Sequence, residues 1–422
     1  MIALIDCNSF FCSVERVFHP GLRHRPLCVL SNNDGCIVAL TPEAKALGLR
    51  RGDPYFKVAP IIEANQVTVF STNMMLYAAM SRRVTNILRK SVMHVENYSI
   101  DESFCYLDGY ERHFHLEQFM RQIAKRILTW TDIPVSVGIA PSKTLAKMGS
   151  KFAKDYRGYD SVCMIDSDER RRKALSLFPL KDVWGIGRHT LAKLEYCGVT
   201  TPLEFADKSE GWVKTHLTLP GQRTWKELNG IPCIDTSEVS QKQSICTSRS
   251  FGQMVSDLPN LRESVATFAA SCANKLRGQR SVAGSVSVFI YSNRFRDDLS
   301  QYADCRTAPL LVKTADTIEI TQAALQLLNE AYRPGIWYKK AGVILSDISS
   351  DAAVSQDLFD RVDNRNERTQ LMKAIDNINH RFGVKSVRLA AEGDSKSAWQ
   401  VKCDHRSQNY LTDLKELLTI HI

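Results

Sequence analysis

The first 165 residues alternate two hydrophobic patterns. Short, nearly continuous apolar runs predict buried strands, whereas apolar residues spaced three or four positions apart predict amphipathic helices. The strand-like runs are 2–5, 27–30, 36–40, 67–70, 95–107 and 134–140, and the clearest helical segments are 76–88 and 114–128. This alternation predicts an α/β or α+β domain over residues 1–165.

The pattern changes twice farther along the chain. From Asp166 the strand-like runs stop, and helical stretches continue to residue 232 or so. A polar stretch at 235–244 is typical of a linker, and after it strand-like and helical segments alternate again as far as residue 350. Residues 351–422 begin with a polar segment and predict two modest helices. We therefore expect a multidomain α+β protein.

Composition and charge narrow the class of protein. The chain carries 55 Lys and Arg against 46 Asp and Glu, and this net charge of +9 favours a polyanionic partner. Its 12 cysteines include no C-x-x-C pair, so we expect reduced cysteines in the core and no structural zinc. No apolar run approaches the roughly 18 residues of a membrane span, and the first residues do not resemble a signal peptide. We expect a soluble, cytoplasmic protein.

Three carboxylates occupy positions that call for a cation. Asp6 ends the first strand-like run, and Asp101 and Glu102 lie between the two β-rich halves of residues 95–107. A buried strand rarely ends on an uncompensated acid, and adjacent carboxylates repel each other. Mg²⁺ prefers oxygen ligands, and two such ions would serve a phosphoryl transfer. The alternative is that Asp6 caps the following helix and the other two are solvated, and the spacing alone does not decide between them.

A lysine-rich helix is expected after the strand at 134–140. Lys143, Lys147, Lys151 and Lys154 recur at intervals of four, four and three residues, so they share one broad helical face. Like charges at this spacing destabilise a bare helix, and a bound triphosphate would relieve them. The alternative is an ordinary solvated lysine face.

The segment VWGIGRHT at 183–190 has the pattern of a helix-hairpin-helix motif. Gly185 and Gly187 permit a sharp turn between two helices. The N–H groups at the start of the second helix can then bind a DNA phosphate without sequence selectivity. Arg188 and Lys193 add positive charge to this end of the helix.

Taken in order, these motifs resemble the Y-family translesion DNA polymerases, specifically the UmuC type, the catalytic subunit of bacterial DNA polymerase V. The match is specific because six segments occur in the correct order, and the later parts of the chain fit by position and length. The segments are DCNSFFCSVE at 6–15, VLSNNDGCIVA at 29–39, EAKALGLRRGDPYFK at 43–57, YSIDESF at 98–104, VGIAPSKTLAKMGSKFAK at 137–154 and VWGIGR at 183–188.

The resemblance implies roles for individual residues. Asp6, Asp101 and Glu102 match the catalytic ligands of two Mg²⁺ ions, and the backbone carbonyl of Cys7 matches a further metal ligand. Phe11 matches the steric gate, a ring that leaves no room for the 2′-hydroxyl of a ribonucleotide.

The resemblance also implies contacts to the substrates. Lys45 and Lys154 match positions that bind the triphosphate of the incoming dNTP, and the turn at 185–188 matches the DNA-binding thumb. The family often has Tyr and Arg in the fingers where this chain has Pro42 and Lys45, so a bidentate contact to phosphate is lost there.

The implied architecture is a right-hand polymerase, and the implied activity is error-prone, template-directed transfer from dNTPs to a primer 3′-hydroxyl past DNA damage, as in SOS mutagenesis. The implied parts are a palm with inserted fingers at 1–165 (fingers about 31–70), a helix-hairpin-helix thumb at 166–232, an α/β little finger at 243–350 and a UmuC-type tail at 351–422.

The tail begins with a candidate clamp-binding peptide. Gln356 followed by the adjacent pair Leu358 and Phe359 resembles the peptide with which bacterial polymerases enter a pocket of the sliding clamp. The family resemblance also implies a UmuD′-type dimer and RecA as partners, but no residue here identifies their binding surfaces.

Two other functions can be weighed against polymerisation. A nucleotide cyclase can share a palm-type sheet with two-metal carboxylates, but it needs neither a helix-hairpin-helix nor a basic third domain. A non-catalytic DNA-binding scaffold could keep the fold, but it would have no need of Asp6, Phe11, Asp101 and Glu102.

Overall fold

The computed structural model describes residues 1–236, 241–353, 360, 362, 364–383, 385–393 and 397–417. The chain divides into two units. The first unit comprises residues 1–31, 35–239 and 405–422, and the second comprises 32–34 and 240–404.

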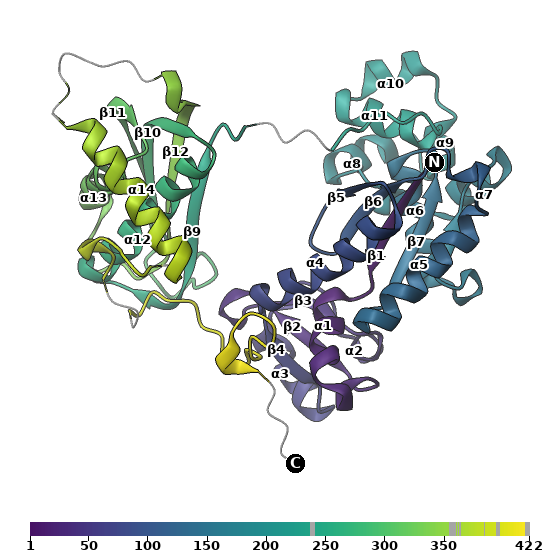
Figure 1. The fold of residues 1–422 in the computed structure, drawn as a ribbon, viewed down its shortest axis with the longest axis horizontal. Helices are drawn as coiled ribbons and strands as arrows, with labels where there is room; N and C mark the ends of the chain where they lie inside the picture. The colour runs from purple at the N-terminus through teal and green to yellow at the C-terminus, as the bar shows by residue number, and fades with distance from the viewer. Residues whose placement is uncertain are drawn as a thin grey trace. The chain divides into compact units, whose positions relative to one another are not determined.

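A five-stranded sheet forms the centre of the first unit, with strand order β5-β6-β1-β7-β8 (Figure 1). The central strand β1 pairs antiparallel with β6 and β7, and β7 pairs parallel with β8. In this register Asp6 lies directly opposite Glu102. The strands are β1 Ile2–Cys7, β5 His94–Asn97, β6 Glu102–Tyr106, β7 Val135–Ala140 and β8 Val162–Met164.

Helices cover both faces of this sheet. Helices α1 (Phe10–Phe18), α4 (Met74–Ser91) and α5 (Leu116–Thr131) share one apolar core with alternate residues of β1 and β7. Helix α6 (Lys143–Asp155) packs with the intervening residues on the opposite face.

Two glycines bring α6 unusually close to β7. A Cβ atom on Gly138 of β7 would lie 2.0 Å from the carbonyl oxygen of Ala146, and one on Gly149 of α6 would lie 3.1 Å from the Cα of Gly138. Side chains at these positions would push the helix off the sheet. The close approach places the lysines of α6 beside the carboxylates of β1 and β6.

A second, smaller sheet of order β3-β2-β4 has its own apolar core. Two short helices pack with the three short strands of this sheet. These elements are β2 Leu27–Leu30, β3 Ile37–Leu40, β4 Thr68–Ser71, α2 Pro42–Ala46 and α3 Tyr55–Ala64.

Five helices follow β8, and they share an apolar core with α6 and the near residues of the large sheet. Pro179 and the turn at 183–187 separate the first two of them. The helices are α7 Asp168–Leu177, α8 Arg188–Tyr196, α9 Pro202–Ala206, α10 Glu210–His216 and α11 Leu219–Leu228.

The second unit contains a four-stranded antiparallel sheet of order β11-β10-β12-β9, with two helices in its core. The sequence pattern predicted alternating strand-like and helical segments here but identified neither β11 nor β12, and β11 is a largely exposed edge strand that contains Pro309. Proline and polar residues are typical of edge strands. The elements are β9 Ile245–Val255, α12 Leu258–Gly278, β10 Ser281–Ser292, β11 Ala303–Thr314, α13 Thr317–Ala331 and β12 Tyr338–Ser350.

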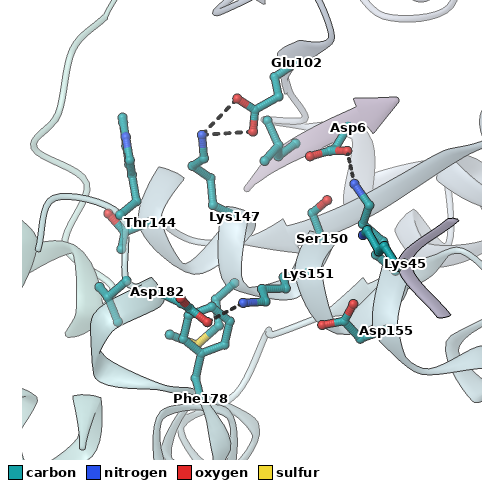
Figure 2. A pocket seen from close by; sticks show the side chains of 15 residues that line it. Asp6, Lys45, Glu102, Thr144, Lys147, Ser150, Lys151, Asp155, Phe178 and Asp182 are labelled. Atoms are coloured by element: carbon teal, nitrogen blue, oxygen red, sulfur yellow. Dashed lines mark hydrogen bonds and ion pairs between the residues drawn. The ribbon is translucent and has the colours of Figure 1, made fainter. Parts of the chain in front are cut away.

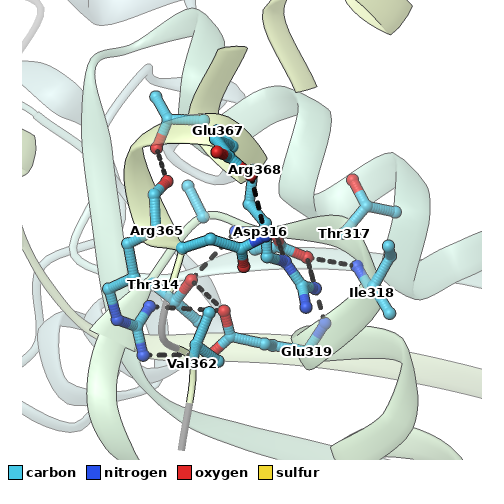
Figure 3. A network of polar contacts seen from close by, with 12 residues as sticks. Thr314, Asp316, Thr317, Ile318, Glu319, Val362, Arg365, Glu367 and Arg368 are labelled. Carbon is cyan, nitrogen blue, oxygen red and sulfur yellow. Dashed lines mark hydrogen bonds and ion pairs between the residues drawn. The ribbon is translucent and has the colours of Figure 1, made fainter. Parts of the chain in front are cut away.

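One further helix, α14 (Arg365–Phe382), is held on the second unit by ion pairs (Figure 3). Arg368 Nε lies 2.7 Å from Asp316 Oδ2, and the Asp316 carboxylate also caps α13. Arg277 of α12 reaches Asp376 at 2.7 Å. The prediction of two helices after residue 351 was wrong for the described residues, because glycines with positive φ at 383 and 393 interrupt the chain beyond α14.

The multidomain α+β fold predicted from the sequence is confirmed. Among the described residues, no helix is long and apolar enough to cross a membrane.

Candidate active site

A cavity of about 410 Å³ opens beside the ends of β1 and β6 (Figure 2). Carboxylates of the sheet and lysines of α6 and α2 line it together. The lining residues are Leu4, Asp6, Lys45, Glu102, Thr144, Lys147, Met148, Ser150, Lys151, Lys154, Asp155, Phe178, Asp182, Val183 and Trp184.

Two of the three predicted catalytic carboxylates lie in this cavity, and each is paired with a lysine of α6. Lys154 Nζ lies 2.9 Å from Asp6 Oδ1, and Lys147 Nζ lies 2.9 Å from Glu102 Oε1 and 3.0 Å from its Oε2. The carboxylate of Asp101 instead accepts a hydrogen bond from Ser99 Oγ at 2.6 Å. The register therefore brings Asp6 and Glu102 together, while Asp101 lies outside the cavity lining.

The electrostatics of the site oppose ionisation of Glu102. Burial, together with the charges of Asp6 and Asp101, raises the pKa of Glu102, although the ammonium of Lys147 opposes the shift. Burial and the same two carboxylates also raise the pKa of the Cys7 thiol far above its ordinary value.

These residues fit a hard divalent cation by their chemistry. Asp6, Asp101 and Glu102 offer oxygen ligands only, the kind that Mg²⁺ prefers. The two that face the cavity each attract an ammonium group, which shows that positive charge is needed there. As the side chains stand, no cluster of three or more His, Cys, Asp and Glu able to hold a metal is found within the described part of the chain.

The predicted lysine face is only partly correct. Lys147, Lys151 and Lys154 line the cavity, and Lys151 pairs with Asp182 at 2.5 Å. Lys143 does not join them, because its side chain is only 2% exposed and pairs with Glu96 at 2.9 Å. It is the first residue of α6, where the side chain can reach back over β6 toward β5.

Lys45, the other predicted triphosphate contact, is exposed on α2 and lines the same cavity as Lys154. The two lysines come from helices far apart in the sequence, so the fold alone brings them to one cavity. An ammonium is a point charge without the planar fork of a guanidinium, so each lysine can screen phosphate charge without fixing its orientation.

Phe11, the predicted steric gate, lies on α1 outside the cavity lining. Its ring is half-buried and stacks on Tyr77 of α4, with the ring centroids 4.5 Å apart and the planes at 15°. The adjacent Phe10 is buried in the core with 3% exposure. Phe11 is thus a supported ring with an accessible side.

The glycine turn before α8 packs closely against α11. Gly185 has φ +95°, and a Cβ atom there would lie 2.2 Å from Thr224 Oγ1 of α11. Gly187 is the N-cap residue of α8, and Arg188, the first residue of the helix, is exposed. The predicted clamp-binding residues Gln356, Leu358 and Phe359 lie outside the described residues.

The sequence analysis missed several residues of the cavity. Phe178, Asp182 and Trp184 precede α8 and close one side, and the ammonium of Lys147 lies 5.1 Å from the centre of the Trp184 ring. Trp184 belongs to the VWGIGR motif, of which only the two glycines and Arg188 were assigned a role from the sequence. An aromatic residue beside a turn that leads into a phosphate-binding helix was the available signal.

Models of known protein families match most of the chain. The model of the impB/mucB/samB family matches residues 5–151, and the C-terminal domain of the same family matches residues 242–358. A domain of unknown function, DUF4113, matches residues 369–420.

Individual proteins agree with these matches. The chain is 39% identical to Protein UmuC of Salmonella typhimurium strain LT2 over the full length of both, and 27% identical to DNA polymerase IV of Brucella melitensis over 92% of this chain and 84% of that protein. Among solved structures, a Y-family DNA polymerase chimera of Dbh and Dpo4 has a TM-score of 0.64 at 20% identity, covering 83% of this chain and 100% of the other. This confirms the predicted right-hand polymerase fold. The chain belongs to the impB/mucB/samB family, together with its full-length relative UmuC.

Proposed function

We propose that this protein is a DNA-directed DNA polymerase that carries out translesion synthesis in the cytoplasm, transferring nucleotides from dNTPs to a primer 3′-hydroxyl. One observation carries the proposal. A single cavity is lined both by the carboxylates of Asp6 and Glu102 and by the ammonium groups of Lys45, Lys151 and Lys154. A triphosphate with bound cations needs both kinds of group.

Each residue of the site contributes positioning or charge. Asp6, Asp101 and Glu102 would hold two Mg²⁺ ions, which supply activation of the primer hydroxyl and charge neutralisation at the leaving pyrophosphate. Lys45 and Lys154 screen the triphosphate. Lys154 already bonds Asp6, so the phosphate and that carboxylate compete for one ammonium group.

Two further elements complete the proposed machinery. The exposed side of the Phe11 ring excludes a ribose 2′-hydroxyl by volume. The turn at Gly185 and Gly187, with Arg188 at the start of α8, holds a phosphate of the primer–template by backbone N–H groups and charge.

The deciding experiment is primer extension by the purified full chain on damaged and undamaged templates, with Mg²⁺ and the four dNTPs. Asp101→Asn should lower incorporation at least about a hundredfold, while primer–template binding is retained, because the substitution removes a metal ligand and no DNA contact. Asp108→Asn is the matched control, since Asp108 is an exposed carboxylate just beyond the other end of β6.

The outcomes separate the candidate functions. A parent protein that binds primer–template but extends nothing would favour the scaffold, and conversion of a nucleotide to a cyclic product would favour the cyclase. Near-normal synthesis by Asp101→Asn would remove that residue from the site.

We also propose three protein partners, a UmuD′-type dimer, RecA and the sliding clamp. For the clamp, the test is the double substitution of Leu358 and Phe359 by Ala. Unassisted extension of short primers should be unchanged while stimulation by the clamp is lost, because burial of each side chain in a clamp pocket contributes about 1.5–3 kcal/mol. Equal stimulation of parent and variant would contradict the clamp proposal.

A further inference from the structure

The C-terminal part of the chain returns to the first unit and packs against α1 and α4. Residues 405–417, within the segment that matches the domain of unknown function, belong to this unit. Ser71 at the end of β4 exchanges two hydrogen bonds with His405, each of 3.0 Å. Tyr410 is buried and stacks on Phe18 of α1 with the ring centroids 4.7 Å apart. The segment therefore forms part of the core around α1.

A buried polar network lies at the centre of this contact. The Glu15 side chain is fully buried, and its Oε1 accepts hydrogen bonds from Tyr77 at 2.7 Å and from Ser407 Oγ at 2.9 Å. Asn73, the N-cap residue of α4, donates to the carbonyl and hydroxyl oxygens of Ser407 at 3.1 and 3.2 Å. Four side chains thus depend on one another for their hydrogen bonds.

The network leads directly to the candidate steric gate. Phe11 and Glu15 are four residues apart on α1, so they lie on the same face of the helix. Tyr77 bonds Glu15 through its hydroxyl and stacks on Phe11 through its ring. The hydroxyl of Ser407 therefore acts on the ring of Phe11 through two intermediate side chains.

The energetic weight of Ser407 follows from the surroundings of Glu15. The second carboxylate oxygen, Oε2, has no hydrogen-bond partner among the described residues. Burial raises the pKa of Glu15, and the hydrogen bonds from Tyr77 and Ser407 oppose that shift. A buried carboxylate with a single remaining donor is costly, so loss of the Ser407 hydroxyl would make Glu15 protonate or turn. Either response changes the bond that fixes Tyr77.

We propose that residues 405–410 are a positioning element for sugar selection, in which Ser407, through Glu15 and Tyr77, holds the Phe11 ring against the nucleotide sugar. This inference rests on the proposed polymerase function, and it assigns a role to part of a domain of unknown function. None of the tail residues touches the substrate in this proposal.

The test compares ribonucleotide with deoxynucleotide use by the full-length chain. Ser407→Ala should raise the ratio of kcat/KM for a ribonucleotide to that for the matching deoxynucleotide by roughly fivefold, because small displacements of a positioning group have large effects on rate. The ratio is independent of the fraction of folded enzyme, so a merely structural role would leave it unchanged. Ser386→Ala is the matched control, an exposed serine of the same tail.

Three more variants test whether the effect of Ser407→Ala on the ratio depends on the Phe11 ring. Tyr77→Phe keeps the stacked ring but removes the donor, so it should raise the ratio as Ser407→Ala does. Phe11→Ala should raise the ratio further, and adding Ser407→Ala to it should change nothing more, because no ring remains to be positioned. An unchanged ratio in Ser407→Ala, or equal effects of Ser407→Ala with and without Phe11, would overturn the proposal.

A second measurement does not depend on catalysis. Hydrogen exchange of the full chain should be faster at residues 73–80 in Ser407→Ala than in the parent, and unchanged at residues 258–278 of α12. If the parent shows no DNA synthesis, the proposed function fails while this link remains testable. Equal exchange at residues 73–80 would overturn the link itself.

Discussion

Two lysine–glutamate pairs, whose lysines lie one turn apart on α6, have the same chemistry but different surroundings. Lys143 and Glu96 are 2% and 7% exposed, and Lys147 and Glu102 are 20% and 17% exposed. The first pair is enclosed by the fold, and the second lines the cavity. The comparison separates a structural ion pair from a candidate catalytic one.

Hydrogen bonding distinguishes the pairs further. Glu96 accepts from Lys143, from Tyr106 at 2.7 Å and from Thr236, and Lys143 in turn donates to Thr236 at 2.7 Å. Burial alone would raise the pKa of Glu96, but these bonds outweigh it and hold the pKa below its ordinary value. Burial raises the pKa of Glu102, and the neighbouring carboxylates of Asp6 and Asp101 add to the rise although Lys147 opposes it. The carboxylate of the buried pair has hydrogen-bond donors around it, whereas the carboxylate of the cavity pair is still repelled by Asp6 and Asp101.

The largest effect is expected from Glu102→Gln. Nucleotide incorporation should fall at least about a hundredfold, because a charged ligand of the catalytic cations is lost. The melting temperature should stay the same or rise, because the substitution removes a repelled, partly buried charge. A variant that loses stability and activity together would make this pair structural, like the first one.

Lys143→Met should have the opposite profile. Breaking a buried ion pair leaves Glu96 uncompensated and costs about 3–5 kcal/mol in the free energy of unfolding. Incorporation per folded molecule should remain within about threefold of the parent, because Lys143 lies outside the cavity. Urea denaturation measures the free energy of unfolding, and active-site titration of the same preparation measures incorporation per folded molecule. A loss of incorporation without a loss of stability would contradict the assignment of this pair as structural.

The sequence predicted the cavity pair better than the buried one. Asp6 and Glu102 stand at recognisable strand ends, and an antiparallel register makes them neighbours. Helical spacing correctly put Lys147 on one face with Lys151 and Lys154, and the fold brings that face to the two carboxylates. The same spacing misplaced Lys143, because its partners lie far along the chain: Glu96 is 47 residues away, and Thr236 is 93 residues away in a polar stretch without periodicity.

Distance along the chain also limited what could be predicted elsewhere. Ser407 lies 392 residues from Glu15, and neither residue carries a pattern that points to the other. The edge strand β11 was missed because its exposed positions and Pro309 weaken the alternation on which strand prediction depends. Local patterns identified the elements, whereas contacts between distant polar residues required the fold.

A smaller effect is expected from Lys147→Met. This pair is partly exposed and screened by solvent, so the loss in the free energy of unfolding should stay below about 1 kcal/mol. Urea denaturation beside Lys143→Met gives a matched comparison, because both substitutions shorten a lysine of α6 in the same way. Equal losses for the two variants would show that exposure does not separate the pairs.

The smallest expected effect is on the pH dependence of stability. Because the folded-state pKa of Glu96 lies below that of an unfolded glutamate, the unfolded chain binds more protons as the solution becomes acidic. The stability from this group is therefore complete above the unfolded-state pKa and is lost as pH falls through the folded-state pKa. Lys143→Met removes one of the bonds that hold this pKa down, so its free energy of unfolding should decline less than that of the parent as the pH falls from about 5 to about 3. Urea denaturation at several pH values measures the slopes, and parallel slopes for parent and Lys143→Met would show that Glu96 does not depend on its lysine.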